Sequence, residues 1–180
     1  MKPAPTVPYS IEFRSRPANL GNLVSHGVVF GGDWNGEACP DWSTVQGLYG
    51  HHNCFNHFYT TNLIWYSDTN TRLLWERVDQ VVYCPTCDGS PVKRLGDIDG
   101  NNIRELVHNA SEFNDYRVEV RTNDIRFFLN NHLVFTYNAQ NSENAMAWIN
   151  DPYFGVFAST DEYSNSTARF EYIKVTPLDN

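Results

Sequence analysis

Apolar and polar residues alternate along most of this chain, and the alternation is most regular in its last third. Every second residue is apolar from Tyr116 to Val120 and again from Ile125 to Leu129. The pair Asn130-Asn131 then predicts a tight turn, because asparagine tolerates a positive φ. The period returns at Leu133, Phe135 and Tyr137. Three short strands joined by tight turns are therefore expected here.

The same period predicts strands over much of the remaining chain. They are expected at residues 7–14, 26–30, 57–66, 72–78, 153–158 and 168–175. Trp65 and Trp75 fall inside two of these strands and are expected in the core or on a sheet face. The one helical pattern, from Ile103 to His108, is too short to anchor a helical fold. Many short strands separated by turns predict an all-β sandwich or barrel.

Two long segments lack a clean period. The first, from Gly31 to Asn56, is rich in Gly, Asn, His, Asp and Trp, and the second runs from Tyr83 to Asn102. Loops of this length inside a compact domain usually carry function. The length of 180 residues fits one domain, residues 1–180, and no repeat or linker divides the chain.

Composition and charge narrow the classes of partner. The net charge is −8 and there is no long basic run, which argues against nucleic acid and against an anionic membrane surface. No apolar stretch approaches the length of a membrane-spanning helix, so membrane insertion is not expected. Aromatic residues reach 14%, more than a core alone requires, and this suits a surface that stacks on flat ligands.

The expected compartment depends on the cysteines and on two sequons. The first residues, Met1 to Pro5, contain no hydrophobic signal core, which by itself would indicate a cytosolic protein. Four cysteines and the glycosylation sequons at Asn109 and Asn165 indicate the opposite. We therefore expect a secreted, extracellular protein whose signal peptide is absent from this sequence.

The four cysteines lie in the two irregular segments. A disulfide framework would staple both loops, either as Cys39–Cys54 with Cys84–Cys87 or as pairs between the loops. A four-cysteine zinc site is the alternative, although only the second pair has the CxxC spacing. A redox CxxC is disfavoured because no βαβ pattern surrounds it. Structural disulfides suit the expected secreted context best.

The order of segments resembles that of the concanavalin-like jelly-roll superfamily, which includes laminin-G-like domains and C-terminal domains of thrombospondin type. The resemblance runs from about Val7 to Val175. It implies two curved antiparallel sheets packed face to face, with the first and last strands often paired. The segments that carry it are Gly27-Val28-Val29-Phe30, His57-Phe58-Tyr59, Tyr116 to Val120, Ile125 to Asn131, Gly155-Val156-Phe157-Ala158 and Phe170 to Val175.

That superfamily includes lectins, carbohydrate-binding modules, glucan hydrolases, polysaccharide lyases and adhesion modules, so the fold alone does not select a function. This chain departs from the common pattern in two ways. It has a long insertion rich in Cys, His and Trp between Asp33 and Asn56. It also lacks the Glu-x-Asp-x-x-Glu strand on which the retaining glucanases of the superfamily place nucleophile and acid.

The first irregular segment has the residue types of a sugar-binding site. Sugar rings present apolar C–H faces that stack on aromatic rings, and neighbouring Asp, Asn or Arg side chains bind the hydroxyls. The alternative is that Trp34 and Trp42 are buried at the rim of the sandwich, under the loop. The candidate ligand-binding residues are Asp33, Trp34, Asn35, Trp42, Tyr49, His51 and His52.

A catalytic alternative uses His57 and Tyr59. A His/Tyr pair can abstract the proton beside a uronate carboxyl and protonate the leaving oxygen, as several jelly-roll lyases do. Arg77 would neutralise the substrate carboxylate, with Arg72 and Asn62 as further candidates. Histidines of this kind also serve as polar loop residues or metal ligands.

The segment Gly96 to Asn102 suggests a calcium site, because carboxylate and amide oxygens suit a hard cation. Its candidate ligands are Asp97, Asp99 and Asn101, and the alternative is a solvated turn. No glutamate closes an EF-hand register. Calcium is therefore a candidate cofactor, and no cofactor is required by the sequence.

The expected function is non-catalytic recognition of a polysaccharide or a glycoprotein glycan through the loop from Asp33 to Tyr59. Two other classes stay open. One is cleavage of a polysaccharide by a lyase or a hydrolase on the same fold. The other is an extracellular adhesion module that binds protein.

Overall fold

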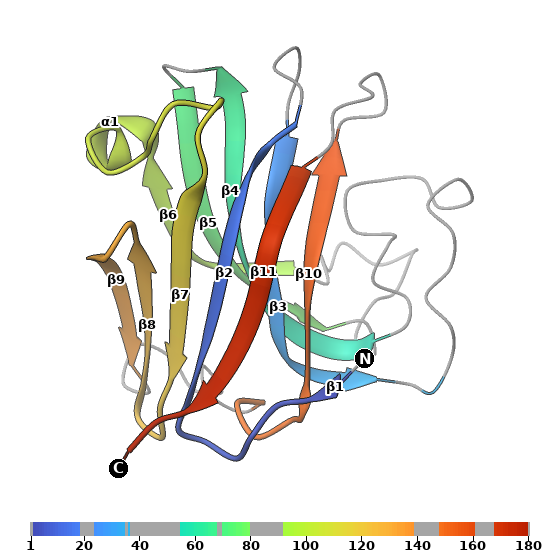
Figure 1. The fold of residues 1–180 in the computed structure, drawn as a ribbon. Helices are drawn as coiled ribbons and strands as arrows, with labels where there is room; N and C mark the ends of the chain where they lie inside the picture. The colour runs from blue at the N-terminus through green and yellow to red at the C-terminus, as the bar shows by residue number, and fades with distance from the viewer. Residues whose placement is uncertain are drawn as a thin grey trace.

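The computed structural model describes residues 2–18, 24–34, 36, 55–67, 70–79, 92–138, 148–160 and 168–179. These residues form two antiparallel sheets that pack face to face (Figure 1). The six-stranded sheet has the order β1 (Lys2–Pro3), β10 (Tyr153–Thr160), β3 (Val24–Trp34), β4 (Phe55–Ser67), β5 (Asn70–Asp79) and β6 (Val92–Asp99). The five-stranded sheet has the order β11 (Ala168–Pro177), β2 (Tyr9–Pro17), β7 (Asn114–Val120), β8 (Asp124–Leu129) and β9 (His132–Asn138).

The connectivity is that of a sandwich in which neighbours in a sheet come from distant parts of the chain. The strand nearest the N-terminus in the five-stranded sheet, β2, lies between the last strand, β11, and β7. In Figure 1 this sheet lies in front, and the short helix α1 (Gly100–Ile103) lies beside β6 at one end of the sandwich. No helix among the described residues is both long and apolar enough to cross a membrane.

One hydrophobic core fills the space between the sheets. The alternation predicted for β2 places Tyr9, Ile11 and Phe13 inward, and each of them is fully buried. Phe13 stacks on Tyr116 of β7, with ring centroids 4.6 Å apart and planes 3° apart. From the other sheet come Phe30, Tyr59, Leu63, Trp65 and Trp75, so both strand tryptophans are core residues as predicted.

A histidine lies in this core. His26 of β3 has no exposed surface, and its Nε2 atom is 3.1 Å from the hydroxyl oxygen of Tyr116. Its ring meets Tyr116 and Phe170 edge to face. Burial lowers the pKa of His26 to about 3, because the charged imidazolium would lose its hydration. His26 is therefore a neutral core residue at physiological pH.

The second segment predicted to be a loop, from Tyr83 to Asn102, contains regular structure and that prediction was wrong. Its described part forms β6 and α1, and β6 pairs with β5 from Val78↔Val92 to Arg72↔Asp99. Leu95 and Ile98 pack against the core. The strand has few apolar residues because it is the edge strand of its sheet, so alternation alone did not identify it. In the helical pattern from Ile103 to His108, only Ile103 is helical, as the last residue of α1, and residues 104–106 form a turn.

The first segment predicted to be a loop is also partly strand. β3 continues through Gly31 to Trp34, and β4 begins at Phe55. An extra residue in β3, relative to both β4 and β10, forms a β-bulge at Gly31, which has a φ of +57°. Glycine is suited to this position because it adopts the left-handed conformation without steric cost.

Two further bulges reverse the alternation in the five-stranded sheet. In β9 the extra residue is Val134, because Phe127 of β8 pairs with Phe135 and the next residue, Phe128, pairs with Leu133. Leu133 therefore lies on the outer face and is 54% exposed, so the prediction that it shares a face with Phe135 and Tyr137 was wrong. In β11 the extra residue is Glu171.

The predicted turn at Asn130 and Asn131 is confirmed, with φ values of 47° and 67°. The two asparagines differ in their contacts. Asn130 Nδ2 donates to the Leu106 carbonyl at 2.6 Å and to Asn114 Oδ1 at 2.8 Å. Its Oδ1 accepts from the Asp115 amide at 2.8 Å. Asn131 is exposed.

We expect the free energy of unfolding of Asn130→Gly to be about 3 kcal/mol lower than that of Asn131→Gly in urea denaturation. Glycine keeps the positive φ in both variants and raises the entropy of both unfolded chains equally. The difference then reports the side-chain hydrogen bonds of Asn130, at roughly 1 kcal/mol each. Equal stabilities would show that these hydrogen bonds contribute nothing to the fold.

Candidate functional site

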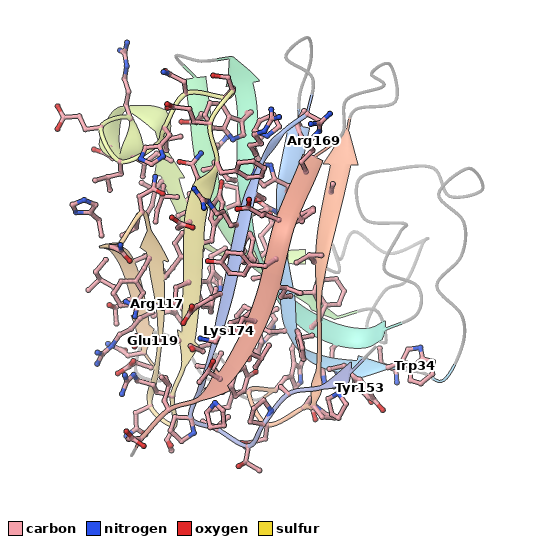
Figure 2. The ribbon with its side chains drawn as sticks, viewed as in Figure 1. Trp34, Arg117, Glu119, Tyr153, Arg169 and Lys174 are labelled. Carbon is pink, nitrogen blue, oxygen red and sulfur yellow. The ribbon has the colours of Figure 1, made fainter. Side chains whose placement is uncertain are left out.

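The exposed aromatic surface of the six-stranded sheet lies where β3 ends and β4 begins. Both strands curve away from the sandwich at this end (Figure 1). Trp34 is 36% exposed, and its ring meets the ring of Tyr153 at an angle of 76°, with centroids 5.7 Å apart. Figure 2 shows the two side chains together at this end of the molecule. Tyr153 thus fixes one edge of Trp34 and leaves part of the indole accessible.

The bulge at Gly31 explains why Trp34 lies on the surface. Without an extra residue, Trp34 would share the inner face with Val28 and Phe30, because side chains two residues apart point the same way. With the extra residue, Gly32 pairs with Tyr153 of β10 and Asp33 pairs with His57 of β4. The bulge therefore shifts the aromatic ring of Trp34 to the outer side.

A hydrogen-bonded carboxylate lies next to Trp34. Asn56 Nδ2 donates to Asp33 Oδ2 at 2.8 Å, and both side chains are half-buried. The amide fixes the orientation of this carboxylate, one residue before Trp34 in β3. We call Asp33, Trp34, Asn56 and Tyr153 the Trp34 cluster.

A second group of side chains surrounds Trp148, in the turn that precedes β10. The His57 ring stacks on Trp148 at 4.2 Å and 18°, and the Arg77 guanidinium lies 4.9 Å from the indole centroid. His57 Nε2 is 2.7 Å from Asp151 Oδ2. The Tyr59 ring also contacts Trp148, and the centroids of the two rings are 5.6 Å apart. We call these five residues the Trp148 cluster.

The backbone around Gly31 connects the two clusters. A Cβ atom at Gly31 would lie 2.6 Å from the Trp148 carbonyl oxygen and 2.9 Å from Cδ2 of Tyr59. The turn at Trp148 can therefore approach β3 only because this residue has no side chain. Ile149, the next residue, belongs to the core. The turn therefore packs directly against β3, the strand that carries Trp34.

The three residues proposed for a lyase, His57, Tyr59 and Arg77, do lie together around Trp148. Tyr59 has no exposed surface, and its hydroxyl oxygen is 3.4 Å from the Trp148 amide nitrogen. Burial raises the pKa of Tyr59 to about 12, against smaller lowering effects of the Trp148 amide and Arg77. A proton-transfer group must reach the substrate, and this tyrosine is covered by Trp148. Lyase chemistry by these residues stays a prediction that the geometry does not favour.

The calcium candidates lie in β6 and α1 instead of in a loop. The Asp97 carboxylate is bound by the Arg72 guanidinium through Nε, at 2.6 Å from Oδ1, and through Nη2. The side chains of Asp99 and Asn101 lie outside the described residues. Among the described residues, no three His, Cys, Asp or Glu side chains come close enough to hold a metal. Arg72 therefore takes the place beside Asp97 that a cation would need.

Several predicted residues lie outside the described part of the chain. They are Asn35, Trp42, Tyr49, His51, His52 and the four cysteines Cys39, Cys54, Cys84 and Cys87. Their roles and the disulfide pairing stay predictions.

The sequence interpretation missed Asn56, Trp148, Asp151 and Tyr153. Trp148 and Asp151 precede the strand predicted at 153–158 and belong to none of the predicted elements, and the pattern predicts Tyr153 only as the first residue of that strand. A tryptophan inside a polar segment was the one local signal that could have identified this turn.

A buried acid on the outer face of the six-stranded sheet was also missed. Glu76 of β5 is 2% exposed and faces Thr60 of β4. Thr60 and Asn62 beside it are likewise buried, and Phe58 and Ile64 flank them on the same strand. None of these residues belongs to the core cluster between the sheets. The sheet therefore has a second set of buried side chains on its outer side.

The comparison with solved structures defines the fold. Sheep galectin-11 aligns with 98% of this chain and 95% of its own, with a TM-score of 0.54 and 10% identity. A Bacillus licheniformis beta-glucanase aligns with 97% of this chain and 69% of its own, with a TM-score of 0.52 and 11% identity. An endo-acting O-glycanase of the human gut microbiota aligns with 99% of this chain and 71% of its own, with a TM-score of 0.59 and 12% identity.

The chain has the concanavalin-like jelly-roll fold. The resemblance noted in the sequence is thereby confirmed for the fold. No protein family and no curated protein matches the sequence itself. At 10–12% identity, these likenesses concern the arrangement of strands and not the side chains of a site.

Proposed function

We propose that this protein binds a polysaccharide or a glycoprotein glycan at the Trp34 cluster. The observation that carries the proposal is the indole of Trp34, which the Gly31 bulge turns outward and Tyr153 fixes at one edge. A fixed, accessible aromatic ring is a stacking platform for the C–H face of a sugar. The Asp33 carboxylate, oriented by Asn56 at the same end of β3, supplies a hydrogen-bond acceptor for a hydroxyl group.

The arrangement of the acids on the outer face of this sheet favours binding over cleavage. Hydrolysis of a glycosidic bond normally uses two carboxyl groups about 5–9.5 Å apart across the scissile bond. On the outer face of the described part of the sheet, Glu76 is buried and Asp97 is bound to Arg72. Asp33 is oriented by an amide, which suits recognition of a hydroxyl group better than proton transfer.

The solved structures that share the fold add support of a general kind. A beta-glucanase and an O-glycanase are named for acting on glycans, and both align with nearly the whole chain. They make a carbohydrate ligand a reasonable first choice for this fold. The choice of site depends on the Trp34 cluster alone.

Secretion remains part of the proposal. Asn109, in the first sequon, is exposed in the turn after α1, and the Glu112 amide donates to its backbone carbonyl at 2.8 Å. An exposed turn is accessible for glycosylation. When the chain is expressed behind an added signal peptide in a eukaryotic host, a mass increase on Asn109 and release into the medium would support this compartment. Retention in the cell without a glycan would contradict it.

The glycan-binding proposal predicts that Trp34→Ala lowers affinity at least tenfold for the glycans that the protein binds on an array. Loss of one stacking platform of about 1.4 kcal/mol corresponds to that factor. Trp34→Phe should retain part of the affinity. Calorimetry with the strongest array ligand would measure all three proteins.

Leu133→Ala is the matched control, because Leu133 is also an exposed large apolar residue but lies on the other sheet. It should bind as the unchanged protein does. Binding to no glycan, or full affinity in Trp34→Ala, would overturn the proposal. New reducing ends, or the ultraviolet absorbance of an unsaturated uronate, would show that the protein is an enzyme.

A further inference from the structure

A groove of about 270 Å³ crosses the outer face of the five-stranded sheet, away from the Trp34 cluster. The strands β11, β2, β7 and β8 form it in that order. Figure 2 shows Lys174 of β11 and Arg117 of β7 on this sheet, which faces the viewer. Its volume is near the lower end of the range for small-ligand sites, about 300–1,000 Å³. The side chains that line it include Glu12, Asp115, Arg117, Phe128, Asn131 and Tyr172.

The strand register arranges these residues in two rows across the sheet. One row contains Tyr172, Arg14 and Asp115, which are Cα partners on β11, β2 and β7. The next row contains Lys174, Glu12, Arg117 and Phe128, which are partners in the same order. Tyr172 and Phe128 therefore stand on opposite sides of the groove. Three strand spacings of about 4.8 Å separate their backbones, roughly 14 Å, which leaves room for a ring between them.

Tyr172 points into the groove because of the bulge at Glu171. In a regular strand, Phe170 and Tyr172 would point to the same face. The extra residue leaves Phe170 inward, where it packs against Phe13 and His26, and turns Tyr172 outward. Tyr172 is consequently 42% exposed. Bulges that redirect one side chain are frequent beside functional sites.

The charges around the groove balance each other. Arg14 forms ion pairs with Asp115 at 3.5 Å and with Glu171 at 3.2 Å. Arg117 pairs with Glu119 at 3.4 Å, and its guanidinium lies 3.9 Å from the Phe128 ring centroid. Acids and bases thus alternate across the face, and neither sign dominates. Such a surface does not select a strongly charged ligand.

Hydrogen-bonding capacity remains within the groove. The Glu12 carboxylate, the Asn131 amide and the Tyr172 hydroxyl make no hydrogen bond or ion pair with another described residue. Together they offer acceptors and donors on both sides of the floor. An aromatic wall beside mixed donors and acceptors matches a ring that has apolar C–H faces and several hydroxyl groups.

We propose that this groove is a second carbohydrate site, for a neutral pyranose, on the sheet opposite to the one that carries the Trp34 cluster. The sugar ring stacks on Tyr172, and its hydroxyls bind Glu12, Asn131 and the Asp115 carboxylate, whose Oδ1 atom also pairs with Arg14. The proposal is independent of glycan binding at Trp34, because it depends on different residues on a different sheet. If both sites bind, the domain can bridge two glycan chains.

Backbone amide shifts in NMR titrations would test the groove directly. Cellobiose, lactose and maltose serve as neutral probes, with glucuronate as an anionic probe and glucosamine as a cationic probe. We expect at least one neutral disaccharide to shift the amides of Tyr172, Asp115 and Arg117. Tyr172→Ala should weaken that binding about tenfold, and Tyr172→Phe should retain most of it. Val156→Ala, an exposed residue of the other sheet, is the control and should bind normally.

The results separate this proposal from the first one. Trp34→Ala should leave the shifts in the groove unchanged, and Tyr172→Ala should leave binding at Trp34 unchanged. The groove proposal is overturned if no neutral disaccharide shifts these amides, or if Tyr172→Ala binds with full affinity. Tighter binding of glucuronate or glucosamine than of every neutral probe would also overturn it.

Discussion

Lowering the pH from 7.5 to 5 is expected to reduce the free energy of unfolding by about 2 kcal/mol through His26 alone. The pKa of this side chain is about 3 in the folded protein and near the ordinary value of 6.5 in the unfolded chain. Below pH 6.5 the unfolded chain therefore binds a proton that the folded protein excludes. The stability is fully present above pH 6.5 and is lost as the pH falls toward 3, where the loss is on the order of 4 kcal/mol.

Urea denaturation at pH 7.5 and at pH 5 measures this effect. His26→Gln should have a smaller difference between the two pH values, because glutamine does not titrate and can still hydrogen-bond the Tyr116 hydroxyl. The readout is the difference between the two pH values, so an overall loss of stability in the variant does not obscure it. His132→Gln, at an exposed histidine of β9, should keep the original pH dependence. An unchanged pH dependence in His26→Gln would show that His26 titrates normally.

Gly31→Ala is expected to destabilise the protein by about 2–5 kcal/mol and to weaken glycan binding at Trp34. An alanine in the left-handed conformation costs about 1–2 kcal/mol. Its Cβ would also lie 2.6 Å from the Trp148 carbonyl oxygen, a backbone atom that cannot rotate away. Overpacking of this kind costs about 1–3 kcal/mol. Relief of the clash requires β3 or the Trp148 turn to move, and this would turn Trp34 from its position against Tyr153.

Gly155→Ala provides the matched control for Gly31→Ala. Gly155 lies on β10, the neighbouring strand, and a Cβ atom there meets nothing within 4 Å. Its stability should change by no more than about 0.5 kcal/mol, as for most surface substitutions. Thermal unfolding and calorimetry of both variants would measure stability and affinity together. If the two alanine variants behave alike, the bulge at Gly31 is not what holds Trp34 outward.

Much of the fold could be predicted from local patterns. The inner faces of β2, β7 and β8 follow from alternation, because side-chain direction in a strand has a period of two residues. The turn at Asn130 and Asn131 follows from the conformational tolerance of asparagine. These features depend on residues that are close in the chain, which is why the sequence alone was enough to identify them.

The site could be predicted only in part. Residue type alone predicts Asp33 and Trp34 as candidate binding residues, and the structure adds their contacts with Asn56 and Tyr153. Tyr153 could not be assigned, because its role depends on pairing with β3, about 120 residues earlier in the chain. β6 was missed for the same reason, since pairing with β5 makes it a strand although it contains few apolar residues.

The sequence by itself determined which class of fold this chain adopts and which residues face the core. Tertiary structure decided which aromatic rings reach the surface. Trp34 and Tyr172 both occupy positions that alternation assigns to the inner face, and bulges at Gly31 and Glu171 turn both outward. A bulge is a mismatch between two paired strands and not a property of either strand alone. Alternation along one strand therefore predicts which face each side chain occupies only as far as the first bulge in its pairing with the neighbouring strand.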